Sequence, residues 1–170
     1  MTEKRCLCGS GRPQKACCGP YLAGNKRPRT AEALMRSRYS AFCTGNIDYL
    51  MATHLTPESE TSNRATLQQT IASTQWVNLI ILSTQKGNAK NTTGLVEFVA
   101  AYRTGAAASL LSLSKLENNL EQLHERSHFV KKQGQWFYTE GDILPPYVPK
   151  PGQPCWCGSK KKYRTCHGQR

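Results

Sequence analysis

The feature that most constrains this chain is a cysteine-rich pattern that occurs near both ends of its 170 residues. A shift of 149 positions places Cys6-Leu-Cys8-Gly9-Ser10 on Cys155-Trp-Cys157-Gly158-Ser159, and Cys17-Cys18-Gly19 on Cys166-His167-Gly168. Each copy reads C-x-C-G-S, then six further residues, then C-[CH]-G. The chain therefore carries two small modules of one design, with a longer segment between them.

The last cysteine position of the pattern indicates metal binding rather than disulfide bonding. It is Cys18 in the first copy and His167 in the second. Thiolate sulfur and imidazole nitrogen both suit tetrahedral zinc, whereas histidine cannot replace cysteine in a disulfide. We predict two structural zinc ions per chain, and the alternative is a cluster of free thiols. The predicted ligands are Cys6, Cys8, Cys17 and Cys18 for one ion, and Cys155, Cys157, Cys166 and His167 for the other.

Two further positions of the repeat have a physical role beside the ligands. A C-x-C pair directs both sulfurs at one ion only if the chain turns sharply, and Gly9 or Gly158 permits the positive φ that such a turn needs. The serine that follows, Ser10 or Ser159, is placed to hydrogen-bond the turn or a ligand sulfur.

The basic charge of the chain is concentrated at its two ends. Residues 1–29 hold seven Lys and Arg against one acid, residues 145–170 hold six against none, and residues 30–144 are balanced. Four thiolates around zinc carry about −2, and three thiolates with a neutral imidazole carry about −1, which leaves the ends at about +4 and +5. This excess is typical of surfaces that meet an anionic partner.

Neither a membrane segment nor a signal peptide is expected. The longest apolar runs, such as Phe98 to Tyr102, are far shorter than the roughly 20 residues that span a bilayer. The first residues contain no apolar run either. We therefore expect a cytoplasmic protein whose thiols stay reduced.

The central segment predicts helices first and an antiparallel sheet after them. Thr30 is a plausible N-cap for a helix with apolar residues at helical spacing, and Gly45 is placed to end it. A short helix is expected from Asp48 to before Pro57, and a weaker one over Ser62–Ser73. Strands are expected over Trp76–Thr84, Gly94–Arg103 and Leu123–Lys132, with a hairpin turn at Gln133-Gly134-Gln135 leading into Trp136, Phe137 and Tyr138. This segregation favours an α+β fold with helices packed on one face of the sheet.

Four regions follow from these patterns. They are an N-terminal zinc module at 1–29, an α+β domain at 30–144, a proline-rich linker at 145–154 and a C-terminal zinc module at 155–170. The linker is expected to be semi-rigid and to present the last module away from a neutral body. Residues 105–119 fit either a short helix or a long loop inserted between two strands.

Several motifs resemble known families. Cys155 to Gly168 resembles the SEC-C motif, a small zinc-binding module also found at the C-terminus of the SecA translocation ATPase. Trp156 and Lys160 depart from the usual proline and glycine, but neither is a ligand. The N-terminal copy keeps the glycine as Gly11 and is otherwise more degenerate.

The central segment is similar to the bacterial YchJ family, on the segments Leu34-Met-Arg-Ser-Arg-Tyr-Ser-Ala-Phe42, Tyr49-Leu50 and His124-Glu-Arg-Ser-His-Phe129 and on Gly134-Gln-Trp136. That family carries SEC-C motifs around a nuclear transport factor 2-like centre, in which helices wrap a curved antiparallel sheet into a cone. The resemblance covers nearly the whole chain and implies this fold, but it implies no activity.

Polar residues of the centre are candidates for a pocket inside the cone. They are Arg36, Tyr39, His54, Glu97, His124, Glu125 and Arg126. An enzyme would use Glu97 or Glu125 with Arg36 or Arg126. The alternative is that these carboxylates only pair with arginines, and His54 is expected to be a helix-end or core histidine. A cone filled by Trp76, Phe98 and Trp136 would favour a scaffold.

We therefore interpret the chain as a zinc-binding, non-enzymatic adaptor, with an enzyme or small-ligand-binding protein as the alternative. The C-terminal module is expected to dock an acidic protein surface or ribosomal RNA, as the resemblance to the SecA tail, which meets the chaperone SecB and the ribosome, also implies. The alternative is a solvated basic tip. The predicted contact residues are Trp156, Lys160, Lys161, Lys162, Tyr163 and Arg164.

Overall fold

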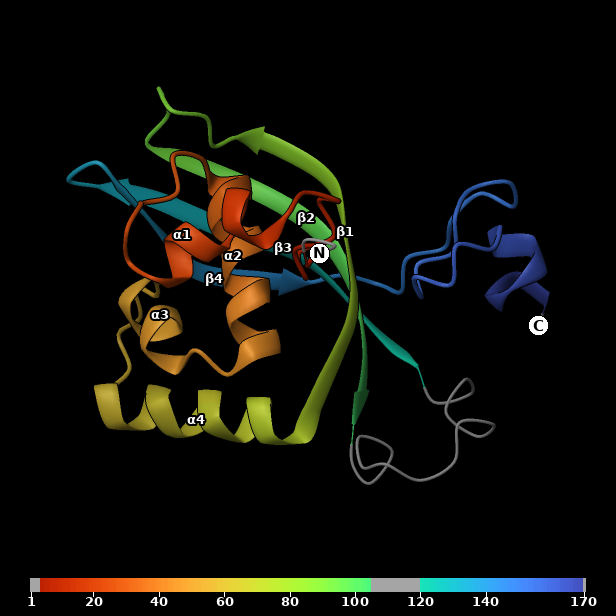
Figure 1. Cartoon of the computed structure of the whole chain (residues 1–170), viewed down its shortest axis with the longest axis horizontal. Coiled ribbons are helices and arrows are strands. Elements are labelled where there is room, and N and C mark those ends of the chain that lie inside the picture. The colour runs from red at the N-terminus through yellow and green to blue at the C-terminus, as the bar shows by residue number, and fades with distance from the viewer. Residues whose placement is uncertain (1–3, 105–119, 170) are drawn as a thin grey trace.

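The computed structural model describes residues 4–104 and 120–169. Figure 1 shows a curved antiparallel sheet with the helices gathered on one side of it. The C-terminal segment lies on the opposite side of the sheet, away from the helices. We call the helix side the inner face and the other side the outer face. The α+β fold with helices packed on a curved sheet is thus confirmed.

The helices are α1 (Gly19–Leu22), α2 (Ala31–Thr44), α3 (Ile47–Ala52) and α4 (Glu60–Ser73). Helix α2 begins where predicted, because the Thr30 hydroxyl accepts a hydrogen bond from the Ala33 N–H at 3.1 Å. It ends at Gly45, which has a φ of 69° that glycine adopts without strain. Within the described ranges, no helix is long and apolar enough to cross a membrane.

The four strands form a meander in the order β1-β2-β3-β4, with every neighbouring pair antiparallel. Gln133 and Gly134 both have positive φ, at 49° and 78°, which matches the tight hairpin turn predicted between β3 and β4. Residues 105–119, for which a helix and a loop were both open, lie outside the described residues. The strand bounds are β1 (Thr74–Lys86), β2 (Thr93–Thr104), β3 (Glu121–Lys132) and β4 (Gln135–Ile143).

Strand β2 is buried on both faces, and this explains the layered architecture. Val96, Phe98 and Ala100 belong to the main core under α2. Val99 and Ala101, which alternate with them, pack against the C-terminal cysteine module instead. Since successive side chains of a strand point to opposite faces, one strand serves both layers.

The proline-rich linker is held against the sheet, so the expectation that it presents the last module away from the body is wrong. The Gln122 side chain donates to the carbonyl of Tyr147 at 3.2 Å and accepts from its N–H at 2.9 Å. The His124 Nδ1 atom lies 2.6 Å from the Pro145 carbonyl oxygen. These contacts fix the linker along β3, where composition alone suggested a free spacer.

Candidate metal centres

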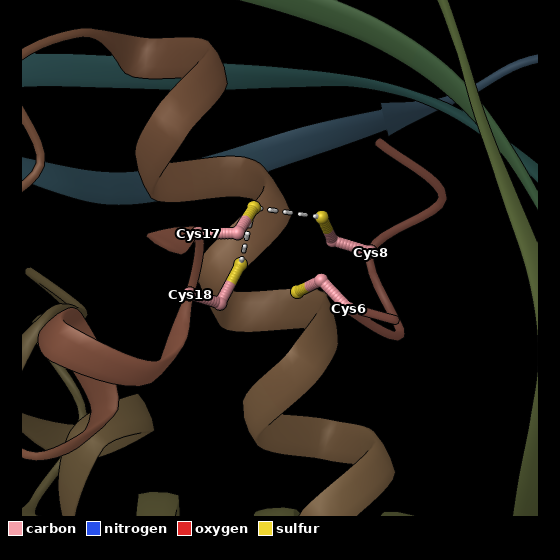
Figure 2. A group of neighbouring side chains, drawn as sticks. All are labelled: Cys6, Cys8, Cys17 and Cys18. Carbon is pink, nitrogen blue, oxygen red and sulfur yellow. Dashed lines mark hydrogen bonds between the residues drawn. The ribbon is translucent and has the colours of Figure 1, made fainter. Parts of the chain in front are cut away.

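The four sulfur atoms of the N-terminal module face a common centre beside α2, as Figure 2 shows. Cys6 and Cys8 lie on the first loop, while Cys17 and Cys18 follow the 3-10 helix η1 (Gln14–Ala16). The Cys17 Sγ lies 3.5 Å from that of Cys8 and 3.9 Å from that of Cys18. All four sulfurs lie within 4.8 Å of one another, so they can hold one metal ion.

The C-terminal module gathers its predicted donors in the same way. The Cys157 and Cys166 sulfurs are 3.6 Å apart, and the His167 Nδ1 lies 3.3 Å from the sulfurs of both Cys155 and Cys166. These four donor atoms also lie within 4.8 Å of one another. The second set can therefore hold a second ion.

The spacing in both sets fits a tetrahedral metal site and not a disulfide. Sulfur atoms bound to one zinc at about 2.3 Å are separated by about 3.8 Å, whereas a disulfide joins them at about 2 Å. All eight cysteines are free. The pKa of the Cys8 thiol falls to about 4 because a hydrogen bond from Cys18 stabilises its thiolate, although burial opposes this. Burial raises the pKa of Cys17, and the hydrogen bond to Cys8 raises the pKa of Cys18. A metal requires the deprotonated form, and Cys8 is the member of this group that already favours it.

The sequence repeat is also a repeat of three-dimensional structure. The Ser10 Oγ lies 3.2 Å from the Cys17 Sγ, and the Ser159 Oγ lies 3.4 Å from the Cys166 Sγ. Each serine thus contacts a sulfur of its predicted donor set and also accepts a hydrogen bond from the backbone of the turn. An isolated β-bridge closes each module at positions 149 residues apart, Arg5 with Pro13 and Pro154 with Lys162.

The N-terminal module is joined to α2 and β1 by polar and backbone contacts. The Arg36 Nη1 donates to the Cys8 carbonyl at 2.9 Å, while its Nε pairs with Glu32 at 2.8 Å. Gly9 has a φ of 73°, and a Cβ there would lie 2.6 Å from the carbonyl oxygen of Leu79 on β1. Arg36, which was expected in the cone, therefore anchors the first cysteine loop.

The C-terminal module is joined to the outer face mainly by apolar packing. Trp156 is 6% exposed and packs with Val99 and Ala101 of β2. Its ring centroid lies 4.5 Å from that of His167. The Asn78 Nδ2 of β1 donates to the Trp156 carbonyl at 3.0 Å. Trp156, at a position where proline is usual, thus provides the apolar surface by which this module attaches to the sheet.

The predicted partner residues divide into two groups. Lys160, Lys161, Lys162 and Arg164 are exposed, whereas Trp156 is buried and Tyr163 is half-buried in the same apolar cluster. The sequence predicts that both aromatic rings belong to the contact surface. Burial of the indole ring removes it from any surface that a partner can reach.

Comparison with known proteins now identifies the chain's family. A model of the middle, nuclear transport factor 2-like domain of YchJ matches residues 30–141, and a SEC-C motif model matches residues 153–169. A UPF0225 protein of Photorhabdus laumondii is 38% identical over 99% of this chain and 100% of its own length. A UPF0225 protein of Serratia proteamaculans is 35% identical over 96% and 97% of the two chains. The chain belongs to the YchJ family.

Two solved structures share the architecture of this YchJ family member. A SEC-C motif containing protein from Rhodopseudomonas palustris superposes with a TM-score of 0.66 at 29% identity, over 84% of this chain and all of the other. A SEC-C motif containing protein from Psychrobacter arcticus gives a TM-score of 0.62 at 25% identity, over 98% and 96% of the two chains. The nuclear transport factor 2-like fold and the SEC-C resemblance are confirmed.

Three of the residues expected in the pocket of the YchJ domain lie on the outer face of the sheet. Glu97 accepts from the Arg126 Nη2 at 3.1 Å and lies 3.2 Å from the His124 Nε2. These hydrogen bonds hold the pKa of Glu97 below its ordinary value, and the hydrogen bond from Arg126 has the largest effect. The cluster is an ion-pair network between β2 and β3, which was the alternative interpretation for Glu97.

The inner face contains a different polar set around a cavity of about 300 Å³. Three of the candidate pocket residues line it: Tyr39, Glu125 and His54. The His54 Nδ1 lies 3.3 Å from the Asn63 Oδ1. Arg38, which sequence reasoning did not select, lines it as well and is only 5% exposed. Its spacing of four residues from both Leu34 and Phe42 on the apolar side of α2 was the signal for it.

Trp76 and Phe98 line this cavity without filling it, whereas Trp136 is buried elsewhere and donates to the Arg29 carbonyl at 3.2 Å. The cone is therefore neither filled by the three rings nor lined by the full set of charged residues that an enzyme was expected to use.

Proposed function

We propose that this YchJ family member is a cytoplasmic, non-enzymatic adaptor that binds two zinc ions and docks an anionic macromolecule through its C-terminal module. Each zinc ion occupies one cysteine set and acts as a structural ion, since four protein ligands leave no open position for substrate. Modules of this length have too little core to fold alone, so the metal supplies their folding free energy.

The observation that carries the docking proposal is the exposed cationic loop between the ligand pairs. Lys160, Lys161, Lys162 and Arg164 occupy four of five consecutive positions, and all four are exposed. In the part of the chain that the structure describes, no ion pair involves any of them. The ligands on both sides of the loop hold these charges on one compact surface.

Backbone strain at Lys160 supports the same proposal. Its φ is 64°, a left-handed conformation that costs a residue with a side chain about 1–2 kcal/mol. The N-terminal copy has Gly11 at the equivalent position, with a φ of 73°. A lysine at a position where glycine would be unstrained suggests that the charge of Lys160 has a role.

The contact surface that we propose consists of the four cations and the exposed edge of Tyr163. Trp156 is omitted because its ring packs on the outer face of the sheet. The partner is either an acidic protein surface or ribosomal RNA, and both would meet the same cations.

Metal analysis of the purified full-length chain tests the zinc assignment. We expect close to two zinc ions per chain, and none of the eight cysteines in a disulfide. A metal content well below two together with disulfides found by mass spectrometry would contradict the assignment.

The docking proposal is tested by replacing Lys160, Lys161, Lys162 and Arg164 with alanine. Deletion of residues 151–170 is a poorer test, because it would uncover the apolar outer face around Val99. The matched control replaces four exposed cations of the other module, Lys4, Arg5, Arg12 and Lys15. Both variants must retain two zinc ions.

The probes are a ribosomal RNA fragment and a polyglutamate peptide, each titrated at several salt concentrations. Four phosphate contacts predict a log–log salt slope of roughly −3 to −4 for the RNA. We expect the C-terminal variant to lose binding to whichever probe the parent prefers, and the N-terminal variant to keep most of it. Equal binding by the parent and the C-terminal variant would refute the docking site.

A further inference from the structure

The second feature of the molecule that invites a ligand is the cavity on the inner face, enclosed between α2, α4 and the sheet. Its volume of about 300 Å³ is at the lower end of the range for small-molecule sites. It lies on the helix side of the sheet, remote from the cationic loop on the outer side. A function assigned to it is independent of the docking proposed above.

Most of the cavity wall is apolar and aromatic. Phe42 and Trp76 form one side, with ring centroids 5.9 Å apart, and Phe98 and Leu123 of the sheet contribute to the lining. Rings of this kind favour an aromatic body that packs against them inside the cavity.

The remaining wall is a compact polar group built around Glu125. The Ser127 hydroxyl donates to the Glu125 Oε1 at 2.6 Å, and the Tyr138 hydroxyl also interacts with the Glu125 carboxyl. The Arg38 guanidinium lies 4.8 Å from the centre of the Tyr138 ring. Burial raises the pKa of the Glu125 carboxyl, as expected for a group removed from water.

The backbone makes room for this buried carboxyl. Glu125 lies over Gly141 of β4, where any Cβ would overlap the carboxyl group. A chain that only needed to fill its core would place an apolar side chain here, since burying a carboxylate costs free energy. The combination of glycine and glutamate indicates that the carboxyl is kept for a contact.

The charges around the cavity decide what kind of molecule suits it. Arg38 donates from Nη1 to the Leu50 carbonyl and to the Thr53 hydroxyl, both at 2.8 Å, so that nitrogen is already engaged by the protein. Glu58 lines the cavity in addition to Glu125, and burial lowers the pKa of His54 and favours its neutral form. The lining therefore offers no excess of positive charge to an anion.

We propose that the cavity binds a small uncharged molecule with a flat apolar body and a hydroxyl group that donates to the Glu125 carboxyl. The aromatic walls hold the body, and the carboxylate recognises the hydroxyl. An analogue that lacks the donor cannot form this hydrogen bond, and the loss of the hydrogen bond is the basis of the discrimination.

Three probes of one shape test the proposal: 2-naphthol, 2-methoxynaphthalene and 2-naphthoate. Each is titrated into the zinc-loaded full-length chain while the Trp76 indole resonance is followed by NMR. We expect 2-naphthol to bind about tenfold more tightly than 2-methoxynaphthalene, the effect of one hydrogen bond to a charged group. The carboxylate of 2-naphthoate should bind most weakly.

Four variants locate the site. Glu125→Leu, of similar size, should bind 2-naphthol and 2-methoxynaphthalene equally, while its stability should not fall, because a buried charge has been removed. The matched control Glu97→Leu, on the outer face, should keep the preference. Leu123→Trp from the sheet and Thr70→Trp from α4 should each abolish binding of all three probes by filling the cavity.

Several results would overturn the proposal. They are the absence of any shift of the Trp76 resonance with all three probes, equal affinity of the parent for 2-naphthol and 2-methoxynaphthalene, and an unchanged preference in Glu125→Leu. Since the two blocking variants come from different elements, misfolding of one leaves the other to decide.

Discussion

The two cysteine modules share their internal geometry and differ in how they attach to the body. Each has a serine hydroxyl beside a sulfur of its donor set, a β-bridge at equivalent positions and a glycine with positive φ after the second cysteine. The N-terminal module joins α2 and β1 through Arg36 and the close approach of Gly9. The C-terminal module covers the outer face with Trp156 and its neighbours. The cysteine pattern thus sets the internal geometry of each module, while residues outside the pattern decide where the module attaches to the body.

The largest expected effect comes from removing one ligand of each module, by Cys8→Ser or Cys157→Ser. Each change should reduce the metal content from two ions to one and unfold its own module, which loses folding free energy of about 10 kcal/mol. Only Cys157→Ser should strongly increase binding of a hydrophobic dye, because it uncovers Val99 and Ala101. Metal analysis and dye fluorescence measure this.

The control for this pair is Cys43→Ser, which lies outside both donor sets and should keep two ions. If the two ligand variants bind the dye equally, the modules do not differ in the apolar area they cover.

The next effect compares the glycines that follow the second cysteines. Gly158→Ala should cost about 1–2 kcal/mol for the left-handed conformation of a residue with a side chain, because its Cβ would lie 3.0 Å from Asn78 side-chain atoms, a contact that a shift of a few tenths of an ångström relieves. Gly9→Ala should cost about 2–5 kcal/mol, because its Cβ meets the backbone oxygen of Leu79. Chemical unfolding with excess zinc measures both, and Gly134→Ala, with no atom within 4 Å, gives the cost of φ alone.

A smaller effect separates the hydrogen bonds that attach the modules. Arg36→Ala should lower the free energy of unfolding by about 1.5–3 kcal/mol, since it removes a charged donor to the Cys8 carbonyl. Asn78→Ala removes a neutral donor to the Trp156 carbonyl and should cost about 0.5–1.5 kcal/mol. Arg64→Ala, in an exposed pair with Asp48, serves as control and should change little. The reverse order of the two costs would contradict this account of docking.

The smallest effect is an exchange between the modules at one position. Lys160→Gly should relieve left-handed strain and stabilise the C-terminal module by up to about 1 kcal/mol, part of the gain being offset by the freer unfolded chain. Gly11→Lys should destabilise the N-terminal module by about 1–2 kcal/mol. Hydrogen exchange of each module measures the change. A destabilising Lys160→Gly would mean that the lysine contributes to folding and not to docking.

Much of the fold was predictable because it depends on neighbours in the sequence. The hydroxyl of Thr30 and the freedom of Gly45 fix the ends of α2 through contacts within one turn. Side chains alternate along a strand, so Glu125 and Arg126 of β3 lie on opposite faces of the sheet, and only Glu125 reaches the cavity. The strand bounds were less certain, because pairing extends strands beyond their apolar residues.

The pocket was predicted less well because burial depends on what distant segments do. Arg36 anchors the first cysteine loop, whereas Arg38 lines the cavity. Composition could not distinguish the two arginines, although residues two positions apart point to different sides of a helix. Glu97 was a candidate because the sequence did not show whether its side of β2 faces the helices or the C-terminal module. It proved to belong to the ion-pair network on the outer face.

The sequence by itself determined the two donor sets, because donor side chains only a few residues apart in a short loop are held close together. The exchange of Cys18 for His167 indicates that such a set binds a metal. It also determined the class of fold, because hydrophobic periodicity changes from helix to strand once along the chain. Only the tertiary structure decided that Trp156 is buried and that the linker lies along β3. Both depend on contacts between residues far apart in the sequence, where packing free energy, and not local conformation, selects the arrangement.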